Sequence, residues 1–441
     1  MPAGATDVNK RLGYLKTATA VITFLMLVIV QSFILPKGNA NQLAQALIID
    51  GFILLGIYTF RGFRWGHRTS LNALLNSVFV GSLFGSLLSL IPIYFFPQRV
   101  SSLFLLLSLL LSIAGAPVLF FIALRLFIKY CPTRRYLVIG KKEQIEPLLE
   151  EVRKASFDKI QIYRYMNPSS IALTQELDNA SAFDGILVAD QQLADHVEPI
   201  LNQVHDRRIP VEYLPNLVED TLQRIPLSLI ETFKDYYEIA FSKANDSPAK
   251  RLFDVILAIA ALVFSSPLLA LFSLLILIES GLPVIFKQTR TGKGFAPFVV
   301  YKFRSLREIS RSKLDKLENP NQTIEQRATK VGKVLRLTRF DEIPQFWNVL
   351  KGDMSVIGPR PEMAAYHEMG MQRIPFYRFR YSLKPGITGW AQIHYKHTSS
   401  PEEYAVKTEY DLYYIKNRTI LLDLQITLHT IETVLGLRGS K

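Results

Sequence analysis

The chain has 441 residues, of which 49% are hydrophobic, and this length suits about two to three domains. Its mean hydropathy of +0.18 is higher than is usual for a soluble protein and favours a membrane protein. The net charge of +13 comes without zinc-ligand spacing, a basic zipper or an RNA-binding signature, so we expect no nucleic-acid partner. Membrane lipids and phosphate-bearing substrates explain this charge better. The single cysteine, Cys131, excludes an intrachain disulfide.

Four apolar stretches lie in the first 130 residues, each about long enough to cross a hydrocarbon core of ~30 Å. They cover residues 17–35, 43–60, 71–96 and 103–128. The cations that flank them are Lys10, Arg11 and Lys16, then Lys37, then Arg61, Arg64 and Arg68, then Arg99, and finally Arg125, Lys129, Arg134 and Arg135. The first, third and fifth of these flanks carry more cations than the second and fourth, and cation-rich flanks lie on the cytoplasmic side. Both ends of the bundle are therefore expected in the cytoplasm. We therefore predict a four-helix transmembrane bundle over residues 1–130.

Residues 131–240 alternate between strand and helix candidates, as expected for a small Rossmann-like α/β domain. The strand candidates are residues 136–140, 159–165, 185–189 and 210–214. Gly140 ends the first strand, but no second or third glycine follows it, so the dinucleotide-binding fingerprint is incomplete. We favour a structural or regulatory module here, with nucleotide binding as the alternative.

The segment 336–362 concentrates carboxylates, guanidinium groups and a tight turn. An amphipathic helix is predicted within it by Ile343, Phe346, Trp347 and Leu350, with Pro344 in its first turn and Gly352 at its end. Asp341 and Glu342 then precede a helix start, where free N–H groups and the helix dipole favour ionised carboxylates. Such a pair can bind Mg2+, and one member can act as a nucleophile. The alternative is an ordinary helix cap followed by an acid in the first turn.

Five cations near this pair are candidate phosphate ligands: Lys302, Arg304, Arg336, Arg339 and Arg360. Arg336 and Arg339 lie about one helical turn apart. We expect them either to bind the phosphate of the lipid or to offset the negative charge of Asp341 and Glu342. Lys302 and Arg304 flank Phe303, which would put both cations on one face of a strand, suited to phosphate or to solvent. Arg360 lies between two prolines on a stiff segment that suits bidentate phosphate binding, with a loop ion pair to Glu362 as the alternative.

The apolar run over residues 252–278 is long enough for a fifth crossing, yet cations flank it on both sides. Because both flanks favour the cytoplasm, we expect the run to enter the membrane and return, with a kinked full span as the alternative. Ser266 and Pro267 lie at its middle, where proline frees a carbonyl group that a serine can satisfy. Asp254 lies at helical spacing from Lys250 and Arg251, which predicts a structural salt bridge at the membrane surface, with headgroup contact as the alternative.

Taken together, these motifs resemble the bacterial sugar transferases, the polyprenyl-phosphate hexose-1-phosphate transferases of the monotopic type. The resemblance rests on Lys250-Arg251-Leu-Phe-Asp254, Ser266-Pro267, and the segments 286–294, 301–305, 336–362, 384–390 and 410–415. It covers roughly residues 248–441, so we assign residues 241–441 to a catalytic domain with a re-entrant helix at 252–278. The expected fold class is therefore membrane α plus α/β, with the catalytic domain following the bundle and the Rossmann-like domain.

The resemblance implies transfer of a hexose-1-phosphate from a UDP-sugar to polyprenyl phosphate, with release of UMP, as the first step of a surface glycan. It implies that Asp341 attacks the sugar-linked phosphorus and that Glu342 binds Mg2+ and orients the pair. It also implies a multi-pass protein of the bacterial inner membrane whose catalytic domain faces the cytoplasm. The oligomeric state stays open, with a homodimer as one option.

Two other functions are kept as alternatives. A membrane-attached nucleotide-sugar dehydratase also places a Rossmann-like domain after a helical bundle, but the glycine fingerprint and a Tyr-x-x-x-Lys pair are missing. A non-catalytic scaffold for polysaccharide assembly would leave the acidic pair Asp341 and Glu342 without a role.

Overall fold

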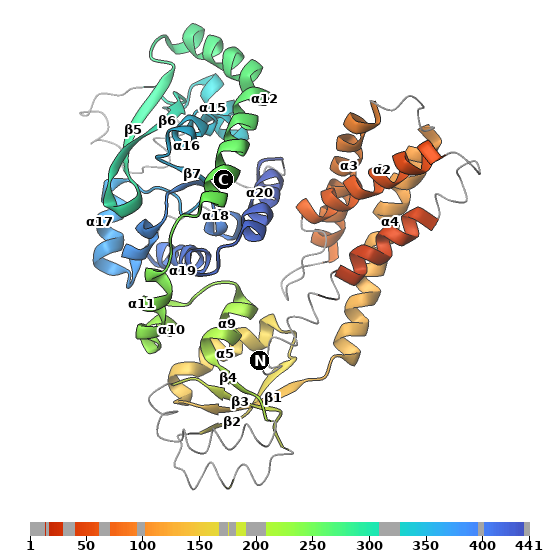
Figure 1. Ribbon diagram of the computed structural model, residues 1–441, viewed down its shortest axis with the longest axis vertical. Helices are drawn as coiled ribbons and strands as arrows, with labels where there is room; N and C mark the ends of the chain where they lie inside the picture. The colour runs from red at the N-terminus through yellow and green to blue at the C-terminus, as the bar shows by residue number, and fades with distance from the viewer. Residues whose placement is uncertain are drawn as a thin grey trace. The chain divides into compact units, whose positions relative to one another are not determined.

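The computed structural model describes residues 14, 17–29, 40–60, 71–94, 102–166, 175, 182–190, 209–307, 327–395 and 401–435. It is mostly helical and contains a parallel sheet, and it divides into two compact units, Met1–Gln223 and Arg224–Lys441. Figure 1 shows both units, with the chain coloured from red at its N-terminus to blue at its C-terminus. The end of the first predicted span, residues 30–35, lies outside the described residues.

Apolar helices fill the first part of the first unit. They are a helix over Thr17–Ile29, α2 (Ala40–Thr59), α3 (Leu71–Tyr94) and α4 (Ser102–Tyr130). In the described ranges, two segments are long and apolar enough to cross a membrane, Asn76–Tyr94 of α3 and the helix at Pro248–Ser280. A Cβ on Gly81 would lie 2.7 Å from Gly56 O, so glycine is what allows α2 and α3 to approach so closely.

The second part of the first unit is a four-stranded parallel sheet with helices. Its strands are β1 (Arg134–Ile139), β2 (Ile160–Met166), β3 (Gly185–Val188) and β4 (Val211–Tyr213), in the order β2-β1-β3-β4. The helices α5 (Lys142–Ala155) and α9 (Leu214–Leu222) pack against each other. Gly140 lies between β1 and α5, where a Cβ would come within 2.4 Å of Ile145 Cδ1. This α/β architecture is the one that the alternating sequence pattern predicts.

The helices α10 (Leu227–Thr232) and α11 (Lys234–Ser242) belong to the second unit, although we expected the α/β domain to extend to residue 240. The backbone N–H of Leu227 donates to Glu409 Oε1 at 3.1 Å, and Arg224 forms an ion pair with the same carboxylate. The Phe241 and Phe379 ring centroids are 5.1 Å apart. A local hydrophobic pattern shows that a helix is amphipathic but cannot show which core it joins.

The remaining elements of the second unit surround a small core. They are α12 (Pro248–Ser280), β5 (Ile285–Thr291), η1 (Lys293–Phe295), β6 (Pro297–Phe303), α15 (Lys330–Thr338), η2 (Phe340–Glu342), α16 (Gln345–Lys351), β7 (Ser355–Ile357), α17 (Ala364–Arg373), η3 (Tyr377–Ser382), β8 (Gly386–Thr388), α18 (Trp390–His394), α19 (Pro401–Asn417) and α20 (Ile420–Leu435). β5 and β6 form an antiparallel hairpin, whereas β7 and β8 pair in parallel.

The long apolar helix α12 contains Pro267 near its middle. Proline has no N–H to donate to the carbonyl four residues earlier, and Ser266 Oγ donates to that carbonyl, Val263 O, at 2.8 Å. This is the compensation that the sequence predicted. Figure 1 shows that α12 bends along its length and that its C-terminal part leads into β5. Its surface is apolar and exposed around the proline, with Phe264 84% exposed.

Candidate active site

Asp341 and Glu342 lie in a tight turn between α15 and α16. α15 ends at Thr338, and Arg339 adopts the left-handed conformation with φ of 58°. The N–H of Glu342 then donates to Arg339 O at 3.2 Å within η2. The two carboxylates therefore precede α16, as the spacing of its apolar residues predicts. Gly352 ends that helix with φ of 93°, which confirms its predicted role.

The Glu342 carboxylate is held by two cations from different parts of the chain. Lys302 Nζ of β6 donates to Glu342 Oε1 at 2.6 Å, and Arg360 Nη2 donates to the same oxygen at 2.8 Å. Arg360 Nη1 lies 3.4 Å from Oε2. Burial alone would raise the pKa of Glu342, but Arg360 and Lys302 outweigh it and hold the pKa well below its usual range. Glu342 is therefore ionised at any physiological pH.

Asp341 differs from its neighbour in its electrostatic surroundings. Burial, and then the charge of Glu342, raise the pKa of Asp341 to about 6, against the opposing charges of Lys302, Arg336 and Arg360. Within the part of the chain that the structure describes, no hydrogen bond to its side chain is recorded. The pair thus combines one carboxylate fixed by cations with one that is ionised near neutral pH and available for reaction.

The structure pairs Arg360 with Glu342, whereas the carboxylate of the nearby Glu362 has other ion-pair partners. Glu362 is 5% exposed and instead forms an ion pair with Lys407 of α19 and lies 3.5 Å from Arg380 of η3. The alternative of a loop ion pair between Arg360 and Glu362 is therefore not the arrangement that the structure contains. The reason is that both residues have stronger partners from elements distant in sequence.

The other three candidate phosphate ligands lie in different surroundings. The charge of Arg336, at the end of α15, lowers the pKa of Asp341, so this guanidinium lies close to the pair. Arg339 forms the turn itself. Arg304 follows the end of β6 and donates to Ser280 O at 2.6 Å, to Leu282 O at 3.0 Å and to Gly281 O. Its guanidinium thus binds carbonyl groups at and just after the end of α12.

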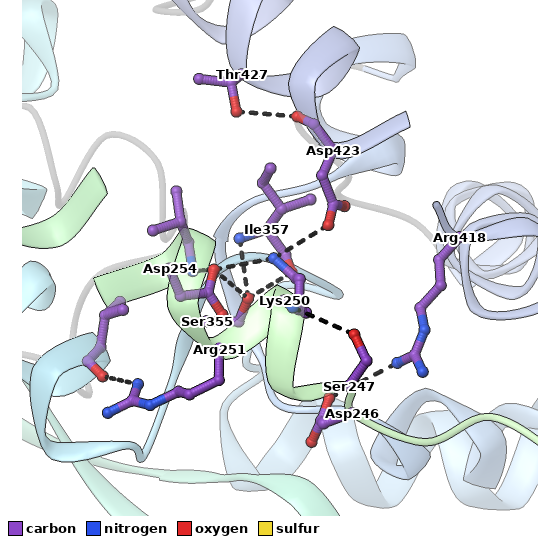
Figure 2. A network of polar contacts seen from close by, with 12 residues as sticks. Asp246, Ser247, Lys250, Arg251, Asp254, Ser355, Ile357, Arg418, Asp423 and Thr427 are labelled. Carbon is purple, nitrogen blue, oxygen red and sulfur yellow. Dashed lines mark hydrogen bonds and ion pairs between the residues drawn. The ribbon is translucent and has the colours of Figure 1, made fainter. Parts of the chain in front are cut away.

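The base of α12, meaning residues 250–254 at its N-terminal end, contacts elements that lie next to the acidic pair. Figure 2 shows Lys250, whose Nζ lies 2.9 Å from Asp254 Oδ1 and 3.3 Å from Asp423 Oδ2 of α20. The same Asp254 oxygen accepts hydrogen bonds from Ser355 Oγ and from the N–H of Val356, both at 3.0 Å. The predicted Lys250–Asp254 ion pair is present, and Asp254 connects α12 to β7.

Arg251 completes this connection. Its guanidinium donates to Val349 O at 2.5 Å and to Leu350 O at 2.8 Å, two carbonyl groups in the last turn of α16. Because α16 begins just after the acidic pair, Arg251 and Asp254 join α12 to elements adjacent to both the pair and Arg360. These contacts give both residues a structural role.

Sequence reasoning missed three charged side chains that support this region, the buried Asp423 and Arg380 and the half-buried Lys407. Asp423 stands among leucines in the amphipathic tail, and an acid in such a position was the available signal. Arg380 and Lys407 lie in stretches rich in polar residues, where no local pattern distinguishes a buried charge from an exposed one.

The carboxylates allow a partial test of magnesium binding. In the described ranges, no group of three or more His, Cys, Asp or Glu side chains lies close enough to hold a metal ion. Mg2+ is, however, commonly held by one or two carboxylates, with waters and substrate phosphates completing its shell. Asp341 and Glu342 supply two adjacent carboxylates, so the residues fit that mode of binding.

The chain is similar in sequence to known sugar transferases. Residues 245–437 match the model of the bacterial sugar transferase family. The UDP-N-acetylgalactosamine-undecaprenyl-phosphate N-acetylgalactosaminephosphotransferase of Aeromonas hydrophila is 36% identical over 268 residues, which are 59% of this chain and 61% of that protein. The UDP-glucose:undecaprenyl-phosphate glucose-1-phosphate transferase of Escherichia coli K12 is 32% identical over 315 residues, 68% of this chain and 67% of that protein.

A shorter relative matches over nearly its whole length. The exopolysaccharide production protein PSS of Rhizobium leguminosarum is 38% identical over 197 residues, which are 43% of this chain and 96% of that protein. The longer relatives are covered less completely, and the chain spans about three fifths of the Aeromonas protein. The family match includes the acidic pair, Lys302, Arg360 and the base of α12. The chain therefore belongs to the bacterial sugar transferase family.

Proposed function

We propose that the protein transfers a hexose-1-phosphate from a UDP-sugar to polyprenyl phosphate and releases UMP. The observation that carries this proposal is the contrast between Glu342, fixed by Lys302 and Arg360, and Asp341, whose pKa is about 6. An anionic nucleophile surrounded by cations suits attack on a phosphorus atom. The Aeromonas and Escherichia coli relatives are named as undecaprenyl-phosphate sugar-phosphate transferases, which supports undecaprenyl phosphate as the acceptor.

The reaction proceeds in two displacements at one phosphorus atom. Asp341 attacks the sugar-linked phosphorus, the bond from that phosphorus to the bridging oxygen breaks, and UMP leaves with the electron pair. An oxygen of the lipid phosphate then attacks the phosphorus and releases the Asp341 carboxylate. Lys302, Arg336 and Arg360 face this region and offset the negative charge of the phosphate groups. The products are UMP and a polyprenyl diphosphate sugar.

Magnesium is proposed as the cofactor, with Asp341 and Glu342 as its protein ligands. When bound, Mg2+ would neutralise phosphate charge at the reacting centre. Glu342 also orients Lys302 and Arg360 directly, because its Oε1 accepts from both. Mutation of Glu342 is thus expected to disturb both metal affinity and the position of the cations.

We also propose that α12 is re-entrant. Asp246, just before the helix, and Lys293, beyond its end, form an ion pair at 2.7 Å. A straight helix of 33 residues would be about 50 Å long, whereas the 13 residues from Gly281 to Lys293 reach ~47 Å only when every one of them is fully extended. The ion pair therefore favours a helix that turns back at Pro267, with both ends on one side of the membrane.

The first unit is proposed to cross the membrane four times, through the Thr17–Ile29 region, α2, α3 and α4. The alternating cations in the flanks support this topology, in which residues 131–441 lie on the cytoplasmic side apart from the re-entrant α12. There a soluble UDP-sugar and a membrane-bound lipid phosphate can meet at Asp341. The protein would then reside in the bacterial inner membrane and start the assembly of a surface glycan.

The decisive experiment is UMP release by the purified protein with undecaprenyl phosphate and Mg2+. UDP-glucose, UDP-galactose and UDP-N-acetylgalactosamine form the donor panel, because the relatives are named for glucose, galactosyl and N-acetylgalactosamine transfer. We expect release with at least one donor and formation of the matching lipid product. EDTA should stop the reaction and added Mg2+ should restore it. No release with any donor would contradict the proposal.

A further inference from the structure

The segment that carries Arg360 is held at three successive residues. Arg380 Nη2 donates to the backbone carbonyl of Arg360 at 3.1 Å. Arg290 Nη1 donates to Pro361 O at 3.4 Å, and the Glu362 carboxylate pairs with Lys407. These cations come from η3, β5 and α19, so the position of Arg360 depends on elements far from it in the sequence.

Arg380 is the most firmly fixed of these cations. Its Nε donates to Asp411 Oδ2 at 2.8 Å, and its Nη1 donates to Tyr377 OH at 2.6 Å. Its Nη2 is the atom that binds Arg360 O and also lies 3.5 Å from Glu362 Oε1. All three nitrogen atoms of this guanidinium are therefore engaged, and only 4% of the residue is exposed.

We propose that Arg380 is a positioning residue that acts on the reaction through Arg360. The guanidinium group is planar and rigid, so fixing two of its nitrogens on Asp411 and Tyr377 also fixes the third against Arg360 O. The carbonyl in turn sets where the Arg360 side chain leaves the backbone, and that side chain reaches Glu342 at 2.8 Å. This inference rests on the proposed function, because its kinetic consequence is a loss of sugar-phosphate transfer.

A lysine at position 380 would keep the positive charge but not the planar guanidinium group with its three nitrogen atoms. Its single nitrogen can remain on Asp411, yet it cannot also donate in fixed directions to Tyr377 OH and Arg360 O. Arg380→Lys should therefore retain the ion pair with Asp411 and lose the hydrogen bond to the backbone carbonyl of Arg360. Substituting a residue that positions a catalytic group commonly lowers activity about 10- to 100-fold.

The test is a double-mutant cycle on UMP release, with Arg380→Lys made in the wild type and in Arg360→Met. In the wild type we expect a fall in kcat/KM of about 10- to 100-fold. In the Arg360→Met background the same change should cost less than about threefold, because the residue through which Arg380 acts is gone. The matched control is Arg378→Lys, two residues earlier in η3, where the side chain is 59% exposed and pairs with Glu238.

An equal loss from Arg380→Lys in both backgrounds would overturn the inference while leaving the transfer reaction intact. If Arg380→Lys fails to fold, Asp411→Asn supplies the same cycle, because it loosens Arg380 without removing it.

Hydrogen exchange of the peptide covering residues 355–365 provides a readout that needs no activity. Exchange should be faster in Arg380→Lys than in wild type and unchanged in Arg378→Lys. Unchanged exchange in Arg380→Lys would overturn the inference even if the wild type released no UMP. Absence of UMP release by the wild type would contradict the proposed function alone and would not bear on the role of Arg380.

Discussion

Lys302 Nζ lies 2.6 Å from Glu342 Oε1, and this ion pair links β6 to the turn that carries the acidic pair. Glu342 is 13% exposed at its side chain, so this ion pair is only weakly screened by solvent. The same carboxylate oxygen also accepts from Arg360. Glu342 therefore organises two cations at once, which a neutral residue could not do.

Lys302→Met should lower transfer activity by removing one of these cations. The pKa of Glu342 should rise, since Lys302 is one of the charges that hold it low, and phosphate charge at the site would be less well offset. We expect kcat/KM to fall about tenfold or more, and the free energy of unfolding to fall by about 1–3 kcal/mol. Steady-state UMP release and thermal melts measure the two effects.

Lys287→Met is the matched control for this variant, because Lys287 lies on the same hairpin with an exposed side chain over the Tyr301 ring. It should change neither quantity appreciably. Equal losses in both variants would mean that the hairpin needs charge in general and not the contact to Glu342.

Asp341→Asn should abolish turnover, because an amide cannot act as the nucleophile at phosphorus. The fold should be retained, since no hydrogen bond to this side chain is recorded among the described residues. The assay is UMP release together with trapping of a phosphosugar on the protein, which the wild type should show and the variant should not. Asp235→Asn, an exposed acid in α11, serves as the control. Activity above a few per cent of wild type in Asp341→Asn would remove this residue as nucleophile.

Local spacing predicted the features whose partners lie within one or two helical turns. The start of α16, the Lys250–Asp254 ion pair and the serine that compensates Pro267 all belong to this group. Each depends on backbone geometry that a few consecutive residues determine, so the residue types were sufficient evidence.

Contacts between distant segments could not be predicted in this way. The sequence offered Glu362 as the neighbour of Arg360, but tertiary packing brings Glu342 to it instead. Arg304 alternates with Lys302 along the chain, yet it lies past the end of β6 and binds the last carbonyls of α12. Asp423 reaches Lys250 only because α20 folds back onto α12. These choices depend on the three-dimensional arrangement of the elements and not on any local pattern.

The two flanks of α12 should lie on the same side of the membrane. Lys243→Cys and Lys287→Cys, each in a Cys131→Ser background, should resist a membrane-impermeant maleimide in intact cells and react after lysis. Lys37→Cys, which the charge pattern places outside, is the positive control. Labelling of Lys287→Cys alone in intact cells would mean that α12 crosses completely.

Glu212 should make the stability of the α/β domain depend on pH. Burial raises the pKa of Glu212 to about 7, while Arg134 and the hydrogen bond from Tyr136 act in the opposite direction. Because the pKa in the folded protein lies above the ordinary glutamate value of 4.5, the protonated form favours folding. This contribution is complete below about pH 4.5 and is lost as the pH rises through about 7.

Glu212→Gln should therefore stabilise the protein at pH 8, by about 1–2 kcal/mol after allowance for partial exposure, and have little effect at pH 5. Glutamine cannot ionise and keeps an acceptor for Tyr136. Thermal unfolding of the full-length protein in detergent at the two pH values gives the comparison. Glu143→Gln in α5, an exposed control, should change neither value. A shift of the same size at both pH values would count against ionisation of Glu212 as the cause.

A chain that begins at Arg224 should retain transfer activity in detergent or membranes. The second compact unit starts there, and every residue with a proposed chemical role lies within it. The Rhizobium relative, matched over 96% of its length by 43% of this chain, shows that a family member can be this short. UMP release per molecule of folded protein is the measurement.

A chain that begins at Ser242 should be much less stable, because it loses the buried side chains of α10 and α11. Tyr237 and Phe241 are fully buried there, and each such side chain contributes about 1.5–3 kcal/mol. Removing both helices should lower Tm by about 10 °C or more relative to the longer chain. If the two chains melted at the same temperature, these helices would not belong to the catalytic unit. If the chain from Arg224 were folded and membrane-bound yet inactive, the first unit would contain a catalytic part.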